Sequence, residues 1–220
     1  MTVHLMNPRS STEKPQRFSL RQREKDERRR RILRSAELAF GSKGYHAASL
    51  TEIAGRAELA VGTIYLYFED KSDLYGSLIL SKMEEIVETM DQALQSLPSP
   101  ADSLRAAVHA QFAFHDANRR FFEIFLHQHQ LQGSPLHPQH WEKLEALKYQ
   151  NLALIEECLT RGQAAGEIRP GPARLYAVAF LGMVLQMIRQ WIRGAEETQL
   201  IDYADFTADC FLQGAVNRKE

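Results

Sequence analysis

The residues most suited to contact with another molecule lie in the stretch that begins at Ser49. Ser49 and, three residues later, Glu52 match a capping box, in which each side chain bonds to the other residue's backbone amide, so a helix is predicted to begin here. Apolar residues then recur at helical spacing. After a turn at residues 58–60, a second short helix is predicted over residues 61–68. Two short helices joined in this way form a helix-turn-helix, whose second helix fits a DNA major groove.

The outward side of this second helix offers few hydrogen-bonding groups. It carries neither a charge nor a side-chain amide, so bidentate contacts from Arg to guanine or from Asn to adenine are not expected there. We expect Thr63 to read base edges, Val61 or Leu66 to contact thymine methyl groups, and DNA shape to contribute. The amino end of the first helix should bind a phosphate, with Thr51 as a weaker candidate.

The spacing of several residues resembles the DNA-binding domain of the TetR family of transcriptional regulators. The resemblance covers residues 28–80 and is carried by Ile53-Ala54, Ala57, Gly62-Thr63-Ile64-Tyr65, Tyr67-Phe68, Lys71 and Leu74. It implies that Tyr65, Tyr67 and Lys71 contact DNA phosphates. An alternative for Tyr65 is a core aromatic residue with its hydroxyl at the edge. The predicted DNA-binding residues are Ser49, Thr51, Val61, Gly62, Thr63, Tyr65, Leu66, Tyr67 and Lys71.

The turn between the two helices departs from the family pattern. Glu58, Leu59 and Ala60 stand where the family usually has Gly, a small apolar residue and Ser or Thr. Without the glycine, we expect either a turn that lacks a left-handed residue or a strained one. Without the hydroxyl, the second helix loses its N-cap, at a cost of roughly 1 kcal/mol.

The net charge of −1 conceals a basic front on an acidic body. Residues 1–34 contain eleven Lys or Arg and four acidic residues, a sum of +7, so the rest of the chain sums to −8. One interpretation of the basic residues is a run of charges that faces solvent and has no binding role. Its place directly before a helix-turn-helix favours phosphate contacts instead. We expect a mobile basic arm over residues 1–22, a DNA-binding domain over 23–75, and a ligand-binding and dimerisation domain over 76–220.

Helical patterns fill the chain and no strand pattern is found, so we predict an all-α protein of about nine helices. One long helix should run from residue 71 to 96, where prolines stop it. The other helices are expected over residues 24–41, 104–118, 119–132, 141–162, 172–193 and 203–216. The helix over residues 172–193 is apolar nearly all round, so more than one of its faces must be covered. It should pair with the last helix and with their copies in a homodimer, as a four-helix bundle in which Gly182 permits close approach.

Aromatic residues and methionines in the second half suggest a ligand site. The resemblance implies that these helices surround a cavity for an inducer whose binding changes the separation of two DNA-reading heads. A mostly apolar lining would suit an aromatic ligand, an acyl chain or an acyl-CoA. The alternative is that each aromatic residue is simply core. The predicted ligand-binding residues are Phe112, His115, Phe122, Phe125, His129, Trp141, Met183, Gln186 and Met187.

Other kinds of site are not indicated. His127 and His129 point to different helix faces, and His137 and His140 flank Pro138 in an expected loop with no carboxylate or thiol nearby, so no metal site is predicted. Catalytic motifs are not found, and we expect neither an enzyme nor a cofactor.

No apolar run approaches a membrane span and no signal core is present, so we expect a cytoplasmic protein. Two cysteines, at positions 158 and 210, are expected to be buried free thiols.

Together these features predict a sequence-specific transcriptional regulator, most simply a repressor that a small apolar ligand releases from double-stranded operator DNA. Two alternatives stay open. One is a DNA-binding regulator without an inducer, architectural or activating. The other is a small-molecule-binding protein or enzyme whose helix-turn-helix is vestigial.

Overall fold

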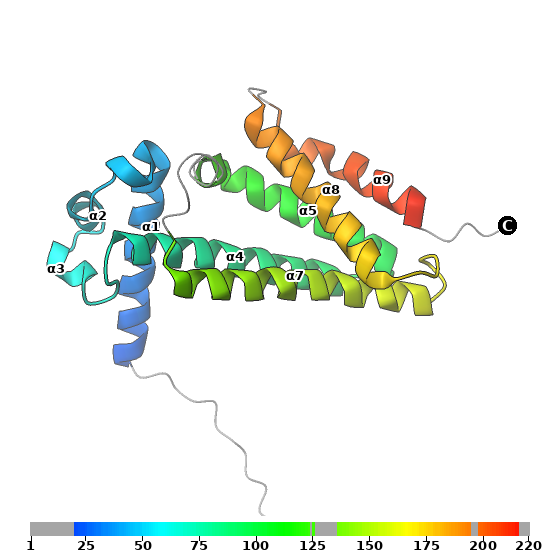
Figure 1. Ribbon diagram of the computed structural model, residues 1–220, viewed down its shortest axis with the longest axis horizontal. Coiled ribbons are helices and arrows are strands. Elements are labelled where there is room, and N and C mark those ends of the chain that lie inside the picture. The colour runs from blue at the N-terminus through cyan, green and yellow to red at the C-terminus, as the bar shows by residue number, and fades with distance from the viewer. Residues whose placement is uncertain (1–19, 124, 126–135, 195–197, 216–220) are drawn as a thin grey trace, which may run out of the picture.

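The computed structural model describes residues 20–123, 125, 136–194 and 198–215. Within these ranges all regular structure is helical, which confirms the predicted all-α class (Figure 1). Residues 119–123 and 125 are also helical. The bounded elements are α1 (Leu20–Ala47), α2 (Leu50–Arg56), α3 (Val61–Ile64), α4 (Lys71–Gln95), α5 (Pro100–Ala117), α7 (Pro138–Ala164), α8 (Ala173–Arg193), the 3₁₀ helix η1 (Leu200–Tyr203) and α9 (Ala204–Ala215).

The predicted helices are present with different ends, except that most of the helix expected over residues 119–132 lies outside the described residues. The helix expected from residue 24 begins at Leu20 and continues past Gly41 to a kink at Gly44, where φ is 79°. The helix expected from residue 141 begins at Pro138 instead, because a proline suits the first turn, where its missing N–H is not needed. Of the two cysteines, which are both free, Cys158 is buried as expected and Cys210 is exposed.

The helix-turn-helix forms at α2 and α3. The Ser49 hydroxyl accepts a hydrogen bond from the Glu52 amide at 3.1 Å, as a helix N-cap does. The expected return bond from the Glu52 side chain is not made, because its two carboxylate oxygens accept hydrogen bonds from Lys43 and Arg56. The second helix is shorter than predicted: it ends at Ile64, and residues 65–67 form turns.

The turn between α2 and α3 is strained. The Glu58 amide donates to the Gly55 carbonyl and the Leu59 amide to the Ala54 carbonyl, which together make a Schellman motif. That motif needs a left-handed residue after the helix, and Glu58 takes this role with φ 53°. Of the two expectations for this turn, the strained one is therefore confirmed. Ala60 at the N-cap of α3 makes no side-chain capping bond.

The head, residues 20–70, shares its hydrophobic core with the body, residues 100–215. One cluster of buried side chains joins α1, α2, α3 and the first half of α4 to Phe121, Phe122, Leu136 and Leu144. A second cluster joins the end of α4 to α5, α7, α8 and α9. The long helix α4 belongs to both clusters and crosses the predicted domain boundary after residue 75 without a break (Figure 1).

Helix α8 covers one of its two apolar faces within the chain. Its inward side chains Ala177, Phe180 and Val184 are buried against α7 and α9. On the other side Leu175, Val178 and Leu185 are exposed, as is Phe206 of α9. By length and composition, α8 is the single helix in the described part of the chain that could cross a membrane, although its inward face packs into the core.

The strain at Glu58 yields the first prediction. Replacing Glu58 with Gly removes the steric cost of the left-handed conformation and should raise the free energy of unfolding by about 1 kcal/mol. Chemical denaturation of Glu58→Gly beside the unsubstituted protein measures this. Glu58→Ala is the matched control, because alanine keeps the strain. An equal gain in both variants would contradict the explanation.

Candidate nucleic-acid interface

The residues around α3 form an exposed, mostly apolar surface at the far end of the head. Leu66 is 78% exposed, Tyr65 56% and Val61 39%, while Ile64 and Phe68 point into the core. Tyr65 is therefore a surface residue, and the alternative that it belongs to the core is wrong. Thr63 and Tyr67 are half-buried beside them, and the space next to Gly62 is open. Thr51 and Ser49 are exposed at the start of α2. Their contacts with DNA stay a prediction.

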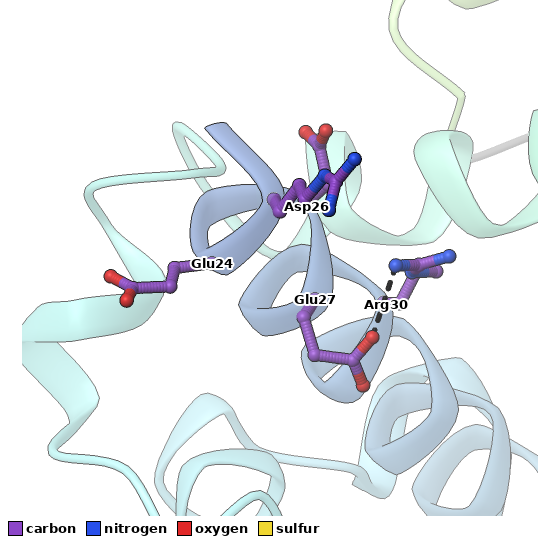
Figure 2. A pocket seen from close by; sticks show the side chains of 5 residues that line it. Glu24, Asp26, Glu27 and Arg30 are labelled. Carbon is purple, nitrogen blue, oxygen red and sulfur yellow. Dashed lines mark ion pairs between the residues drawn. The ribbon is translucent and has the colours of Figure 1, made fainter. Parts of the chain in front are cut away.

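The first half of α1 supplies positive charge beside this surface. Every side chain from Arg21 to Arg30 is exposed. Arg29 lies 5.4 Å from the centre of the Phe68 ring, which places its guanidinium against the chain that follows α3. Glu27 pairs with Arg30 at 3.0 Å (Figure 2) and with Arg34 at 3.2 Å. The shallow hollow drawn in Figure 2 is lined by this one helix alone and mixes both charges, so it is a solvated face of α1.

Lys71, at the start of α4, makes contacts inside the protein. Its ammonium donates to the carbonyls of His46 and Ala48 at 3.2 and 3.1 Å, and lies 4.6 Å from the centre of the Tyr45 ring. Two of the three donor hydrogens of the ammonium are therefore bonded to backbone carbonyls. Lys71 thus ties α4 to the connection that leads into α2.

His140 has a carboxylate partner, contrary to the sequence-based expectation. It lies in the first turn of α7, not in a loop, and its Nε2 is 3.1 Å from Oδ1 of Asp73 in the first turn of α4. Sequence reasoning missed this pair because its two residues are far apart along the chain. Over the residues that the structure describes, no group of three or more metal-ligating side chains is present. His127 and His129 lie outside the described residues.

The predicted ligand-binding residues divide between the two clusters of the core. Phe112 is fully buried in the cluster of the body, where Met183 and Met187 are half-buried. Phe122, Phe125 and Trp141 pack with the cluster of the head. Gln186 is exposed, and His129 is outside the described residues. Their role as ligand contacts stays a prediction.

His115 lies deep in the body and is held neutral. Its Nδ1 is 2.7 Å from the Gln111 carbonyl, and its ring packs 4.3 Å from that of Phe122. Burial lowers the pKa of His115 to about 4 from its ordinary value of 6.5, although the Gln111 carbonyl and the Asp116 carboxylate act in the opposite direction. At neutral pH this side chain can therefore offer a hydrogen bond but no charge.

A small hollow lies at the end of α8. Its volume is about 240 Å³, which is below the usual range of ligand pockets, and its lining includes Trp191, Gln190 and Tyr203. Met187 is the one predicted ligand-binding residue among its lining. Arg119 lies 4.4 Å from the centre of the Trp191 ring and donates to the Gly194 carbonyl. Trp191 was not among the predicted ligand-binding residues, and it is also a buried member of the cluster of the body.

The pKa of His115 yields a second prediction. In the unfolded chain this side chain binds a proton below pH 6.5, whereas in the folded protein it does so only near pH 4. Unfolding therefore takes up a proton within that window, and the free energy of unfolding falls as the pH is lowered through it. The loss should reach about 3 kcal/mol at the acid end.

Urea denaturation from about pH 7 to about pH 4 measures this loss. The control is His115→Gln, which retains a donor for the Gln111 carbonyl and does not titrate. The fall in stability should be smaller in this variant by the same amount. Equal pH dependence in the two proteins would show that His115 is solvated.

Comparison with known proteins agrees with this arrangement. Residues 32–78 match the family described as "Bacterial regulatory proteins, tetR family", and residues 98–215 match "Tetracyclin repressor-like, C-terminal domain". The chain is 24% identical over 188 residues to the fatty acid metabolism regulator protein of Bacillus subtilis (strain 168), which covers 85% of this chain and 95% of that protein. It is 30% identical over 194 residues to the HTH-type transcriptional repressor BepR of Brucella suis biovar 1 (strain 1330), which covers 85% of this chain and 91% of BepR.

A solved structure shares the fold. The transcriptional regulator FadR from Bacillus subtilis, in complex with stearoyl-CoA, matches with a TM-score of 0.72 at 24% identity, over 84% of this chain and 98% of that chain. The family matches cover the head and the body, which the structure shows to be a helix-turn-helix unit and an all-helical second unit. The chain therefore belongs to the TetR family of bacterial transcriptional regulators.

Proposed function

We propose that this protein is a dimeric repressor that binds operator DNA in the cytoplasm and releases it when an acyl-CoA or a similar apolar ligand enters the body. It acts by binding and not by catalysis. The observation that carries the proposal is the exposed surface around α3, where Val61, Tyr65 and Leu66 have no covering segment in the described chain and the arginines of α1 lie alongside. Apolar contact with thymine methyl groups and shape readout suit such a surface better than hydrogen-bonded readout.

The outer face of α8 and α9 supports a homodimer. Leu175, Val178, Leu185 and Phe206 are exposed there, and an apolar face of this kind is stabilised when a second copy covers it. The space next to Gly182 is open on the same helix, so the backbones of two α8 helices could approach closely. A two-fold dimer would carry two heads, as binding to two successive major grooves requires.

The body supports an apolar ligand of the acyl-CoA class. Aromatic rings and methionines from α5, α8 and residues 121, 122 and 125 lie in or against the two buried clusters. A fatty acid metabolism regulator and a regulator in complex with stearoyl-CoA are among the similar proteins. The hollow of about 240 Å³ is too small for a long acyl chain, so entry of the ligand would have to separate packed side chains. The ligand would then favour the more open arrangement and lower operator affinity by its preference for that state.

A regulator without an inducer is the second candidate. It is favoured by the same interior, because Phe112 is fully buried and His115 is closely packed against Phe122. A filled body of this kind would hold the two heads at a fixed spacing.

One binding experiment tests the proposal and separates the two candidates. Genomic DNA fragments selected by the protein are titrated in fluorescence anisotropy, with and without stearoyl-CoA. We expect specific binding that stearoyl-CoA weakens at least about tenfold, a coupling within the usual allosteric range, and that free coenzyme A leaves unchanged. Specific binding that stearoyl-CoA does not alter would favour the inducer-free regulator. Absence of binding to duplex DNA at low ionic strength would contradict both.

The contacts of Lys71 yield a separate prediction. We expect Lys71→Met to weaken DNA binding because the connection into α2 loosens, while the slope of log affinity against log salt concentration stays the same. A direct phosphate contact would instead reduce that slope by about 0.9 per head. Lys148→Met is the control for loss of one charge, since Lys148 pairs with Glu145 on α7. A shallower slope for Lys71→Met alone would show that Lys71 contacts phosphate.

A further inference from the structure

We propose that His140 and Asp73 are a positioning pair through which the body sets the orientation of α3. His140 is in the first turn of α7 and Asp73 in the first turn of α4, and both helices begin beside the head (Figure 1). Their side chains are 4% and 15% exposed, and Nε2 of His140 lies 3.1 Å from Oδ1 of Asp73. The effect on DNA affinity rests on the proposed function, whereas the contact itself does not.

Asp73 passes this contact on to the chain that leaves α3. Its second oxygen, Oδ2, accepts a hydrogen bond from the backbone amide of Glu69 at 2.9 Å. Glu69 directly follows Phe68, whose buried ring anchors the end of the α3 region in the core of the head. One carboxylate therefore bonds at the same time to α7 and to the segment next to the reading surface. A shift of α7 relative to α4 would change the position of this carboxylate and of the Glu69 amide with it.

Asp73 is itself held firmly in place. Its backbone amide donates to Oδ1 of Asp70 at 2.8 Å, and Asp70 is the N-cap of α4. This capping bond fixes the first turn of the helix, so the Asp73 side chain projects from a rigid element. The backbone of Asp73 is therefore fixed, whereas its carboxylate is oriented by its own partners, the Glu69 amide and His140.

The fold leaves space for His140 by means of a glycine. A Cβ atom on Gly76 would lie 2.3 Å from Nδ1 of His140, far inside van der Waals contact. Any other residue at position 76 would displace the imidazole ring from Asp73. The close approach of α7 to α4 at this point thus depends on the missing side chain of Gly76, which lies one turn beyond Asp73.

The hydrogen bonding of the His140 ring also supports a positioning role. Nδ1 of His140 is buried and has no hydrogen-bond partner, so the bond to Asp73 through Nε2 is its one polar contact. Burial lowers the pKa of His140, with Asp73 opposing this effect and Lys143 and His137 adding to it. A neutral ring with its proton on Nε2 donates to the carboxylate and leaves Nδ1 as an unpaired acceptor. Asp73 is then the hydrogen-bond partner that orients this ring.

The test uses His140→Phe in the full-length protein. Phenylalanine keeps the flat ring and the packing but removes the Nε2 donor. Amide exchange of the peptide that contains Glu69 is followed by mass spectrometry. We expect it to become roughly tenfold faster, because the Asp73 carboxylate loses the partner that orients it, while amides of α5 and α9 keep their rates. His137→Phe is the matched control, since His137 lies on the same turn, is exposed, and makes no capping bond.

A second variant separates positioning from simple packing. Asp73→Asn should speed the same exchange, and adding His140→Phe to it should produce little further change, because both substitutions break one chain of contacts. Faster exchange throughout α4, α5 and α9, or unchanged exchange at Glu69, would overturn the proposal. If the protein binds operator DNA, His140→Phe should also lower that affinity severalfold. Altered exchange in a protein that ignores DNA would uphold the positioning pair and contradict the proposed function instead.

Discussion

The first turn of α4 is the point on which the arrangement of the head depends. Asp70 caps this turn. Lys71 and Asp73 lie within the turn, and their side chains bond to other segments of the chain. Lys71 holds the carbonyls of His46 and Ala48 at the entrance to α2. Asp73 holds the Glu69 amide behind α3 and the imidazole of His140 on α7. Three segments are therefore fixed against one helical turn by two charged side chains, and hydrogen bonds to charged groups are stronger than those between neutral ones.

A shared core makes this arrangement effective. Helix α3 spans only Val61–Ile64, and a helix of this length is not stable by itself in water. It persists because Ile64 and Phe68 are buried among side chains of α1, α2 and α4, which in turn pack against Phe121 and Leu144. The Arg120 side chain adds a hydrogen bond to the Gly41 carbonyl, and Lys82 pairs with Glu37 and donates to Asn118. Head and body are thus connected by apolar packing and by polar contacts, so movement of one has a physical route to the other.

Two parts of the protein surface expose apolar side chains that the described chain does not cover. Within the body, polar side chains form hydrogen bonds between segments. Both carboxylate oxygens of Asp116, for example, accept hydrogen bonds from the backbone amides of Leu200 and Ile201 at 2.8 Å. The outer face of α8 is different in kind, because Leu175, Val178 and Leu185 are exposed on it. Together with Val61, Tyr65 and Leu66 around α3, these side chains give the chain two exposed apolar surfaces. One suits a second copy of the chain and the other a duplex.

Sequence alone determined the all-helical class, the helix-turn-helix, the long α4 and the apolar α8, because these follow from apolar spacing, caps and prolines within a few residues of one another. The Ser49 cap and the strain at Glu58 could also be anticipated, since each depends on the residue type at a local position. Tertiary structure alone decided that Glu52 turns to Lys43 and Arg56, that α3 ends at Ile64, and that His140 meets Asp73. It also decided that Lys71 contacts backbone carbonyls and that the aromatic residues of the body divide between two clusters. These outcomes depend on which helices lie side by side. A periodic apolar pattern predicts that one face of a helix is buried, but it does not predict which other helix covers that face.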